Sequence, residues 1–471
     1  DVSMLFLAFL IFLGIAAILN YTVPPNNNDS ISTHMSRVGY WLQQGSFEPW
    51  DTQKNRQLFY PVNAQVQMLW TILFTGSDHL VGFVQWKALL ASMATVFGIS
   101  RLLNASRPQA AFAALVLPSL PAILLQSTTT QNNLVTGALF STCFYYFFLA
   151  VRNNRKDLFI VSGAALGIGL ATNLTILFML PGFSLAILLV WLVHKQVSFR
   201  MIFLLIGGMV SSFLLIGSTI FIINLRVYQN PLGPDSDLGH AIQGLVNPSE
   251  SLLLNSTRLM YQAVDPSGLP RQLEDAGVEL KADLARTLFN TVNIPIESSR
   301  GLVEGRTFNL DTRYYLQEDT AWYGPVGFLI LFPAMLVGLM TGIKKRESIT
   351  SSIFLAALGF LVSDALLRPG WDAYQGRYFI PVVSLATPLL VFWLVPGWRR
   401  WIFGLAIASL AITVMYRTSF TNPAKPLREM TNLYPPKSIP ACYLGIGPHR
   451  QDNHPKRRYQ CGMSYGGSAG S

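Results

Sequence analysis

Near its start the chain has an apolar run, SMLFLAFLIFLGIAAILNYTV (residues 3–23), that passes directly into a polar segment, PPNNNDSISTHMSRVGYWLQQG (residues 24–45). The apolar run is long enough to cross a bilayer, whose hydrocarbon core of about 30 Å needs about 20 helical residues. It lacks the basic start and the small-residue cleavage site of a signal peptide, so we expect a membrane helix. Ionisable groups beside a membrane are costly unless they have a function, which draws attention to the segment that follows.

Apolar runs recur over the whole chain of 471 residues, of which 51% are hydrophobic and 12% are charged. The mean hydropathy is +0.38. These values predict an all-α polytopic membrane protein. The sequence holds eleven runs that we expect to be transmembrane helices, namely 3–23, 79–100, 108–125, 133–151, 157–173, 174–193, 201–223, 323–343, 349–366, 378–395 and 399–417.

Basic residues gather in the short connections between these runs. The positive-inside rule keeps short basic loops in the cytoplasm. All the clusters lie there if the chain starts on that side: Arg101 and Arg107; Arg152, Arg155 and Lys156; Lys195 and Arg200; Lys344, Lys345 and Arg346; Arg399 and Arg400. The outer side then receives the loops 24–78 and 367–377, the segment 224–322 and the tail 418–471. Topology thus accounts for the net charge of +10, and nucleic-acid binding is not indicated.

The long polar stretches predict four parts: an N-terminal membrane module (1–223), an outer subdomain (224–322), C-terminal membrane helices (323–417) and an outer tail (418–471). In the first outer loop, residues 61–75 begin at a proline and predict an amphipathic helix lying in the membrane interface. In the outer subdomain, apolar positions three and four apart predict helices over 247–264 and 271–290.

Three cysteines fit this topology. Cys143 lies within an apolar run, whereas Cys442 and Cys461 both lie in the predicted outer tail. An oxidising compartment would allow a disulfide between these two, which we expect, and two unpaired thiols are the alternative. No CxxC or HxxxH spacing occurs, so no zinc site is predicted.

Polar motifs on the predicted outer side follow one another along most of the chain, to about residue 420. They are Asp29-Ser30 with His34, Arg37 and Tyr40-Trp41; Tyr60-Pro61; the QNNL string at 131–134; the NPLGP string at 230–234; Glu318-Asp319; and the GRY string at 376–378 with Pro381. In this order they resemble the GT-C glycosyltransferases. Within these, the chain is most similar to bacterial relatives of the dolichyl-phosphate-mannose protein mannosyltransferases and of the lipid A aminoarabinose transferases.

The resemblance implies a fold, a reaction and a location. Members of this superfamily are integral membrane enzymes that take a sugar from a polyprenyl-phosphate carrier at the outer face of the membrane. For this chain it implies an inverting transferase of the bacterial inner membrane, whose partners are the lipid-linked donor and the bilayer. The mannosyltransferase-like branch generally works without a metal, so we expect no required cofactor. Some members of the wider superfamily use a divalent cation, which leaves a cation as the alternative.

Asp29 is the first candidate for catalysis. Glycosyl transfer requires that an acceptor hydroxyl lose its proton, and in the family an acid in this loop acts as the base or orients the acceptor. Asp29 alone stands directly beyond the first helix. The alternative is that its side chain caps a short helix beginning at Ser30, a position at which aspartate is preferred.

Arginines at the outer face are candidates for the donor phosphate, because a guanidinium can meet two phosphate oxygens with two N–H groups. The best placed is Arg377 with Tyr378, and Arg368 and Arg37 are further candidates. The alternative for Arg377 and Tyr378 is an interfacial anchor pair, since such residues are common where a helix leaves the headgroups.

His34, Glu318 and Asp319 are candidates for orienting the acceptor. A loop histidine is more often a satisfied structural residue, and paired acids before a helix are often only solvated. Asp29, Glu318 and Asp319 would offer oxygen ligands to a divalent cation if their loops met.

Three departures from the family pattern weaken the prediction of activity. Asn133 stands where many relatives have a second acid, and Asn173 follows Thr172 where relatives often have a lysine. An amide can neither act as a base nor balance a phosphate charge. The string around His34 reads THMSR (residues 33–37) in place of the usual YHLPR form. Two hypotheses therefore remain: a working transferase, and a catalytically lapsed relative that serves as a scaffold or accessory subunit of a larger membrane complex. A transporter is a weaker third reading, because charges at helix centres are scarce.

Overall fold

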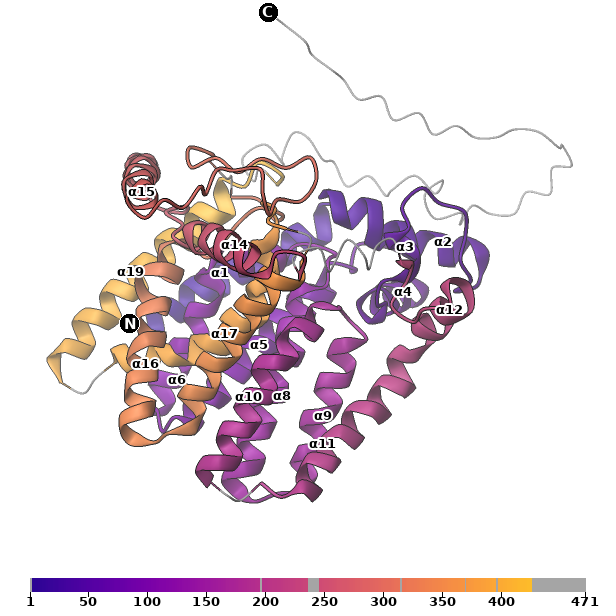
Figure 1. The fold of residues 1–471 in the computed structure, drawn as a ribbon, viewed down its shortest axis with the longest axis horizontal. Coiled ribbons are helices and arrows are strands. Elements are labelled where there is room, and N and C mark those ends of the chain that lie inside the picture. The colour runs from indigo at the N-terminus through magenta and orange to yellow at the C-terminus, as the bar shows by residue number, and fades with distance from the viewer. Residues whose placement is uncertain are drawn as a thin grey trace, which may run out of the picture.

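The computed structural model describes residues 2–194, 197–235, 245–313, 316–368, 370–394 and 397–425. Within these ranges the chain forms helices and no β-strand, so the all-α fold class is confirmed. The helices pack as a bundle with loops and short helices gathered over one end (Figure 1). Cys442, Cys461 and their predicted disulfide lie outside the described residues.

Nine helical segments of the described chain are long and apolar enough to cross a membrane. Helix α1 is Val2–Thr22, α5 is Phe83–Leu102, α8 is Asn133–Asn153, α10 is Thr175–His194, α17 is Ser348–Leu367 and α19 is Trp398–Phe420. Three segments are composite: α11 (Phe199–Ser212), η3 (Phe213–Gly217) and α12 (Ser218–Tyr228); η5 (Val326–Leu331) and α16 (Phe332–Lys345); and η6 (Gln375–Phe379), α18 (Ile380–Ala386) and η7 (Thr387–Trp393).

The count of eleven spanning helices is not confirmed. The run predicted at 157–173 forms α9, Asp157–Leu170, an apolar helix below spanning length. The run predicted at 108–125 is broken into α6 (Arg107–Val116), η2 (Leu117–Ser119) and α7 (Pro121–Gln126). Two prolines explain the break, because Pro118 and Pro121 lack the N–H that a continuous helix needs, and Leu120 between them is extended.

The first outer loop contains α2 (Ser36–Gln44), α3 (Arg56–Phe59) and α4 (Asn63–Thr75). Helix α4 confirms the amphipathic helix predicted at 61–75. Its polar residues Asn63 and Gln65 are buried against the protein, whereas Trp70, Leu73 and Phe74 are exposed. Such an outward apolar face is what a helix lying against lipid requires.

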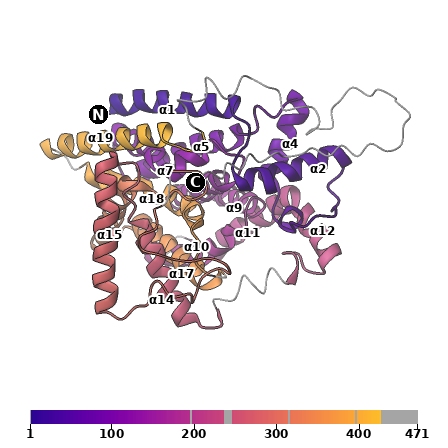
Figure 2. The same ribbon diagram turned by 90° about the horizontal axis from the view of Figure 1, so that it is seen from above.

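The segment 224–322, predicted as an outer subdomain, contains the two helices expected from its sequence, α14 (Pro248–Ala263) and α15 (Arg271–Thr291). Helix α15 is seen end-on in Figure 1 and from the side in Figure 2, so it lies across the ends of the spanning helices. It exposes a row of leucines, Leu273, Leu280, Leu284 and Leu288. The spacing of seven, four and four places them on one side of the helix.

Glycines allow two helices to pack closely in the bundle interior. A Cβ atom added at Gly359 of α17 would lie 2.5 Å from the Cα atom of Gly182 in α10. No side chain fits between backbones at this distance, so small residues are required where the two helices cross. This crossing holds α17, which leads to Arg368, firmly against α10.

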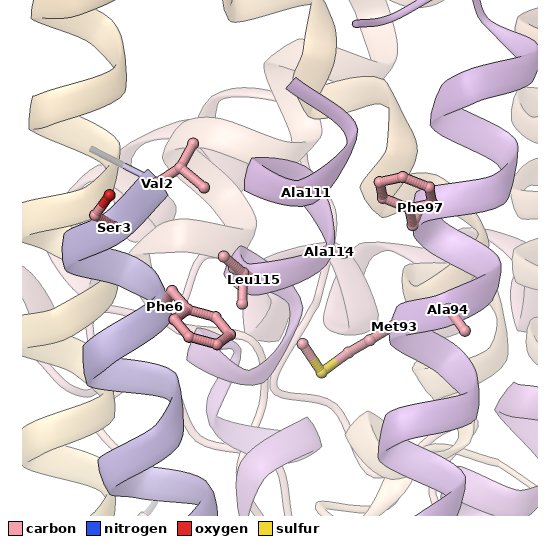
Figure 3. A pocket seen from close by; sticks show the side chains of 9 residues that line it. All are labelled: Val2, Ser3, Phe6, Met93, Ala94, Phe97, Ala111, Ala114 and Leu115. Atoms are coloured by element: carbon pink, nitrogen blue, oxygen red, sulfur yellow. The ribbon is translucent and has the colours of Figure 1, made fainter. Parts of the chain in front are cut away.

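An apolar groove of about 490 Å³ lies among α1, α5 and α6 (Figure 3). Val2, Ser3 and Phe6 from α1 face Met93 and Phe97 from α5 across it. Its lining contains no ionisable side chain, so it suits an acyl or isoprenyl chain better than a polar reactant. The groove lies at the end of α1 opposite to Asp29 and is not a candidate for the reaction site.

Candidate functional site

Arg377 is the centre of a buried polar cluster at the loop-covered end of the bundle. Its Nη2 atom lies 2.5 Å from Asp29 Oδ2, and its Nη1 atom lies 2.9 Å from Asp319 Oδ1. The same Nη1 donates to Gln131 Oε1 at 3.1 Å, and Nη2 donates to Tyr378 Oη at 3.3 Å. One guanidinium therefore joins the first outer loop, the start of α8 and the turn before η5, as only a forked donor can.

The local sequence explains how this cluster is held. Arg377 lies in the short 3₁₀ helix η6, and the backbone immediately before it is packed closely. A Cβ atom on Gly376 would lie 2.9 Å from Trp322 Nε1, so this position has no room for a larger residue. Tyr323 Oη donates to the Gly376 carbonyl at 2.7 Å, which fixes η6 against the segment that carries Asp319.

Asp29 does not act as the helix cap that its position suggested. The helical turn that begins at Ser30 takes no side-chain hydrogen bond from Asp29, so that part of the capping interpretation is wrong. The carboxylate is instead paired with Arg377. Burial raises the pKa of Asp29, but the charge and hydrogen bond of Arg377, together with electrostatic interactions with His34 and Arg56, outweigh it, and the pKa lies below its ordinary value. Asp29 is thus ionised at neutral pH.

Asp29 is followed by an unusually wide helical turn, η1, which is a π-helix over Ser30–Met35. Turns of this kind are frequent at functional sites. Within it, His34 Nδ1 is hydrogen-bonded to Gln65 of α4. Burial and the nearby positive charges of Arg37 and Arg377 lower the pKa of His34 to about 3, against the opposing effect of Asp29. His34 is therefore neutral at physiological pH.

We expect the free energy of unfolding to decrease as the pH is lowered from 7.5 to 5, because of His34. Its pKa is lower in the folded chain than the ordinary 6.5, so below pH 6.5 only the unfolded chain takes up this proton. The side chain is partly accessible to solvent. We therefore expect the free energy of unfolding to fall by about 1 kcal/mol at pH 5, which is less than the whole pKa difference would give. His34→Gln should lose less stability than the wild type over this range, as measured by thermal unfolding. Equal losses in both proteins would contradict the assignment.

Arg37 has a structural position. Its guanidinium is buried and donates to four backbone carbonyls, of Arg56 at 3.0 Å, Gln57 at 2.5 Å, Tyr60 at 3.0 Å and Pro61 at 3.3 Å. Those contacts fold the chain around α3 and carry it into α4. The predicted role of Arg37 in phosphate binding therefore receives no support from its geometry, because the side chain's donors are used within the loop.

Arg368 and Tyr378 lie next to Arg377. The Arg368 guanidinium is stacked on the Tyr378 ring, 3.9 Å from its centroid, and Arg377 lies 5.2 Å from the same ring. Arg368 also forms an ion pair with Asp364 at the end of α17. Tyr378 thus separates two guanidinium groups, which permits two positive charges to lie close together at low cost.

Glu318 and Asp319 are adjacent in sequence but have different partners. Asp319 Oδ1 accepts from Arg377, from Gln131 Nε2 at 2.7 Å and from Asn27 Nδ2 at 3.1 Å. Glu318 points to the segment after α19, where its Oε1 lies 3.0 Å from Lys425 Nζ. Glu318 is therefore a structural anchor, and Asp319 is the member of the pair that belongs to the site.

Lys425 is a residue that sequence reasoning missed. The Lys425 and Glu318 side chains are 2% and 1% exposed, and Nζ also donates to the Thr128 carbonyl at 2.5 Å. Asn422 Nδ2 donates to Glu318 at 3.0 Å, and Asn26 Nδ2 donates to the Ala424 carbonyl at 2.6 Å. The only available signal was a lysine on the predicted outer side, where the positive-inside rule does not call for one.

Amides stand at 133 and 173, where the family resemblance led us to expect charges. Asn133 Nδ2 donates to Gln131 Oε1 at 2.9 Å and to Gln126 Oε1 at 3.1 Å, so it supports the side chain that contacts Arg377. Asn173 Nδ2 donates to Asn132 Oδ1 at 2.9 Å. Both asparagines therefore belong to a hydrogen-bonded network behind the site.

The acids of the site surround an arginine. Asp29 and Asp319 both face Arg377, and Glu318 faces Lys425, so each carboxylate already meets a protein cation. Among the described residues, no three His, Cys, Asp or Glu side chains are grouped as metal ligands. This donor set does not fit a divalent cation, and the expectation that no metal is required stays a prediction.

Comparison by sequence finds one family. The model of the dolichyl-phosphate-mannose-protein mannosyltransferases matches residues 60–221, about a third of the chain. No curated protein matches the chain by sequence.

Comparison by structure finds membrane enzymes. The apo oligosaccharyltransferase of Archaeoglobus fulgidus aligns with a TM-score of 0.53 at 14% identity, covering 96% of this chain and 61% of that one. AglB from the same organism, in complex with an inhibitory peptide and a dolichol-phosphate, aligns with a TM-score of 0.52 at 14% identity. The alignment covers 96% of this chain and 61% of AglB. Apo ArnT from Cupriavidus metallidurans gives 0.52 at 11% identity, covering 90% of this chain and 76% of that one. This chain spans about three fifths of the archaeal protein's length. The chain therefore has the fold of the GT-C membrane glycosyltransferases.

Proposed function

We propose that the chain transfers a sugar from a polyprenyl-phosphate donor to an acceptor hydroxyl, with Asp29 as the base. One observation carries this proposal: Arg377 holds Asp29 Oδ2 at 2.5 Å, while the Asp29 side chain is still 36% exposed. The second carboxylate oxygen, Oδ1, makes no hydrogen bond within the described residues. Asp29 is thus an oriented, ionised carboxylate with one oxygen open to a reactant.

The reaction follows from that geometry. Asp29 Oδ1 accepts the proton of the acceptor hydroxyl as the acceptor oxygen attacks the anomeric carbon of the donor sugar. The bond between that carbon and the phosphate oxygen breaks, and the polyprenyl phosphate leaves with the electron pair. Attack opposite to the leaving phosphate inverts the anomeric configuration.

Arg377 alone does not supply enough positive charge for the phosphate. With Asp29 and Asp319 ionised, the three side chains carry a net charge of −1. Arg377 Nε has no hydrogen-bond partner in the described residues, which leaves one donor for a phosphate oxygen. Arg368, across the Tyr378 ring, is the second cation that we assign to the phosphate.

The comparisons support the class of donor. The matching family is named for a dolichyl-phosphate sugar donor, and AglB, which shares the fold, has been solved with a dolichol-phosphate. We further propose that the reaction takes place at the outer face of the bacterial inner membrane, since the polar cluster lies opposite to the predicted cytoplasmic loops.

Asp29→Asn is expected to leave the protein folded and to lower transfer by about a hundredfold to ten-thousandfold, the usual effect of losing a general base. The measurement is release of lipid phosphate by reconstituted protein supplied with a panel of undecaprenyl-phosphate hexoses and pentoses. Asp51→Asn, an exposed acid of the same loop, is the matched control and should retain activity. Unchanged turnover in Asp29→Asn would contradict the assignment of Asp29 as the base.

A lapsed transferase is the second candidate. The observation that favours it is the set of amides at Asn133 and Asn173, which are built into internal hydrogen bonds where relatives often carry charges. It predicts that the wild type releases no lipid phosphate with any donor of the panel, and that the chain instead co-purifies from its native membrane in a larger complex.

A further inference from the structure

A polar cavity of about 50 Å³ lies between α14, α15 and the segment that leads to η5. We call it the outer polar cavity and define it by Gln262, Asp265, Asp275, Lys281 and Trp322, all of which line it. A water needs about 10–15 Å³ by this measure, so the cavity accommodates about four waters or the polar edge of one sugar ring.

Two of the residues that line the cavity, Gln262 and Trp322, have buried donors without an acceptor in the described part of the chain, and the half-buried Lys281 lies beside them. Gln262 Oε1 accepts from Trp371 Nε1 at 2.8 Å, which leaves its buried Nε2 without a partner. The buried Trp322 Nε1 also lacks one. Lys281 Nζ lies 4.0 Å from the centre of the Tyr261 ring, and no described carboxylate lies within ion-pair distance of it. Unpaired buried donors are costly, so a site with two of them beside the Lys281 ammonium is suited to a ligand that bears acceptor oxygens.

The acids of the cavity, by contrast, have donors already. Asp265 accepts from the backbone N–H of Ser267 at 3.0 Å and of Gly324 at 3.1 Å. Asp275 pairs with Arg313 at 2.5 Å. Each of these carboxylates still has lone pairs to receive a further N–H or O–H.

This combination decides the chemical class of the ligand. An anion would face the carboxylates of Asp265 and Asp275, and a cation would face Lys281. A hydroxyl group can accept from Lys281, Gln262 or Trp322 and donate to Asp265, so neighbouring hydroxyls match both sets. The Tyr261 ring lines the same cavity, where the Lys281 ammonium lies over it.

The outer polar cavity shares a wall with the Arg377 cluster. Trp322 follows three residues after Asp319, and its indole lies against Gly376, directly before Arg377. We propose that the outer polar cavity binds vicinal hydroxyl groups of a neutral sugar, which is the acceptor of the transfer reaction or part of it. The identification as acceptor rests on the proposed function, whereas the binding of a sugar does not.

The test measures binding without any donor. Protein in nanodiscs is titrated with maltotriose, chitotriose, a Ser/Thr hexapeptide and glucuronate, and binding is followed by saturation-transfer NMR. We expect a neutral oligosaccharide to bind. Lys281→Met should weaken the affinity for the oligosaccharide about tenfold, because a charged donor is lost. Trp322→Phe should weaken the affinity about fivefold, because a neutral donor is lost. Neither donor has an internal acceptor, so the fold loses no hydrogen bond. Arg271→Gln, an exposed residue of α15, is the matched control and should bind as the wild type does.

Each outcome decides between the two proposals. No oligosaccharide binding at millimolar concentration, unchanged binding in both variants, or preference for the peptide or glucuronate would overturn the sugar site. If the site fails in this way while Asp29→Asn still stops transfer, the proposed function stands. If the oligosaccharide binds with the expected variant pattern while the wild type consumes no donor, the sugar site stands and the transferase function falls.

Discussion

Arg377→Met is expected to abolish transfer and to lower the free energy of unfolding by about 3–5 kcal/mol, the usual cost of breaking a buried ion pair. The guanidinium is 9% exposed and contacts both Asp29 and Asp319. Its removal leaves Asp319 with two amide donors, from Gln131 and Asn27, and without a neutralising charge. The measurements are release of lipid phosphate and chemical unfolding of the purified protein.

Arg377→Lys separates charge from geometry. A lysine keeps the positive charge but has no fork with which to reach Asp29 and Asp319 together, so we expect stability to recover in part and transfer to stay lost. Arg306→Gln is the matched control, because Arg306 is exposed and lies 5.0 Å from the ring of Tyr374 beside the site. Full activity in Arg377→Lys would show that charge alone suffices, contrary to this account.

Lys425→Met is expected to be the most destabilising substitution outside the spanning helices, at about 3–5 kcal/mol. It leaves the carboxylate of Glu318, 1% exposed, with only the amide of Asn422 as a donor. Because Glu318 precedes Asp319, transfer should also decline. The measurement is the free energy of unfolding, with transfer assayed at a temperature at which the variant remains folded.

A double variant distinguishes the lost charge pair from lost packing. Glu318→Gln combined with Lys425→Met should regain much of the stability, since no buried charge is then left unpaired. Arg300→Met removes an exposed pair with Glu250 at 2.9 Å and should cost less than about 1 kcal/mol. A double variant no more stable than Lys425→Met would refute the ion-pair explanation.

The motifs at Asp29, Asp319 and Arg377 were sufficient to predict that these residues lie at the same end of the helices. Each lies beside an apolar run on the same predicted side, so a correct topology brings them to one end of the bundle. The pairing itself was not predictable, because each of these residues is as common in a solvated loop as in a buried cluster. The position of these residues relative to the apolar runs predicts their side of the membrane, whereas their ion-pair partners depend on the tertiary fold.

Other features depended on contacts that no local pattern reveals. Arg37 looked free to bind a phosphate, but its donors are taken by the carbonyls of the turn at 56–61. Lys425 lies just beyond the last spanning helix, where composition suggests only an irregular tail. The apolar run at 108–125 predicted a continuous helix. Pro118 and Pro121 break this helix without lowering the hydropathy of the run. The roles of the amides depend on tertiary hydrogen bonds.

The adjacent acids Glu318 and Asp319 have a consequence for biosynthesis. Asp319 contacts residues near the start of the chain, whereas Glu318 contacts residues 422 and 425, which follow the last spanning helix. The Asp29 to Arg377 pairing also requires a segment that is synthesised late. A partly translated chain therefore has no assembled site, even after most of its helices have entered the membrane. On the proposed function, transfer therefore begins only after the segment that carries Asn422 and Lys425 has been synthesised.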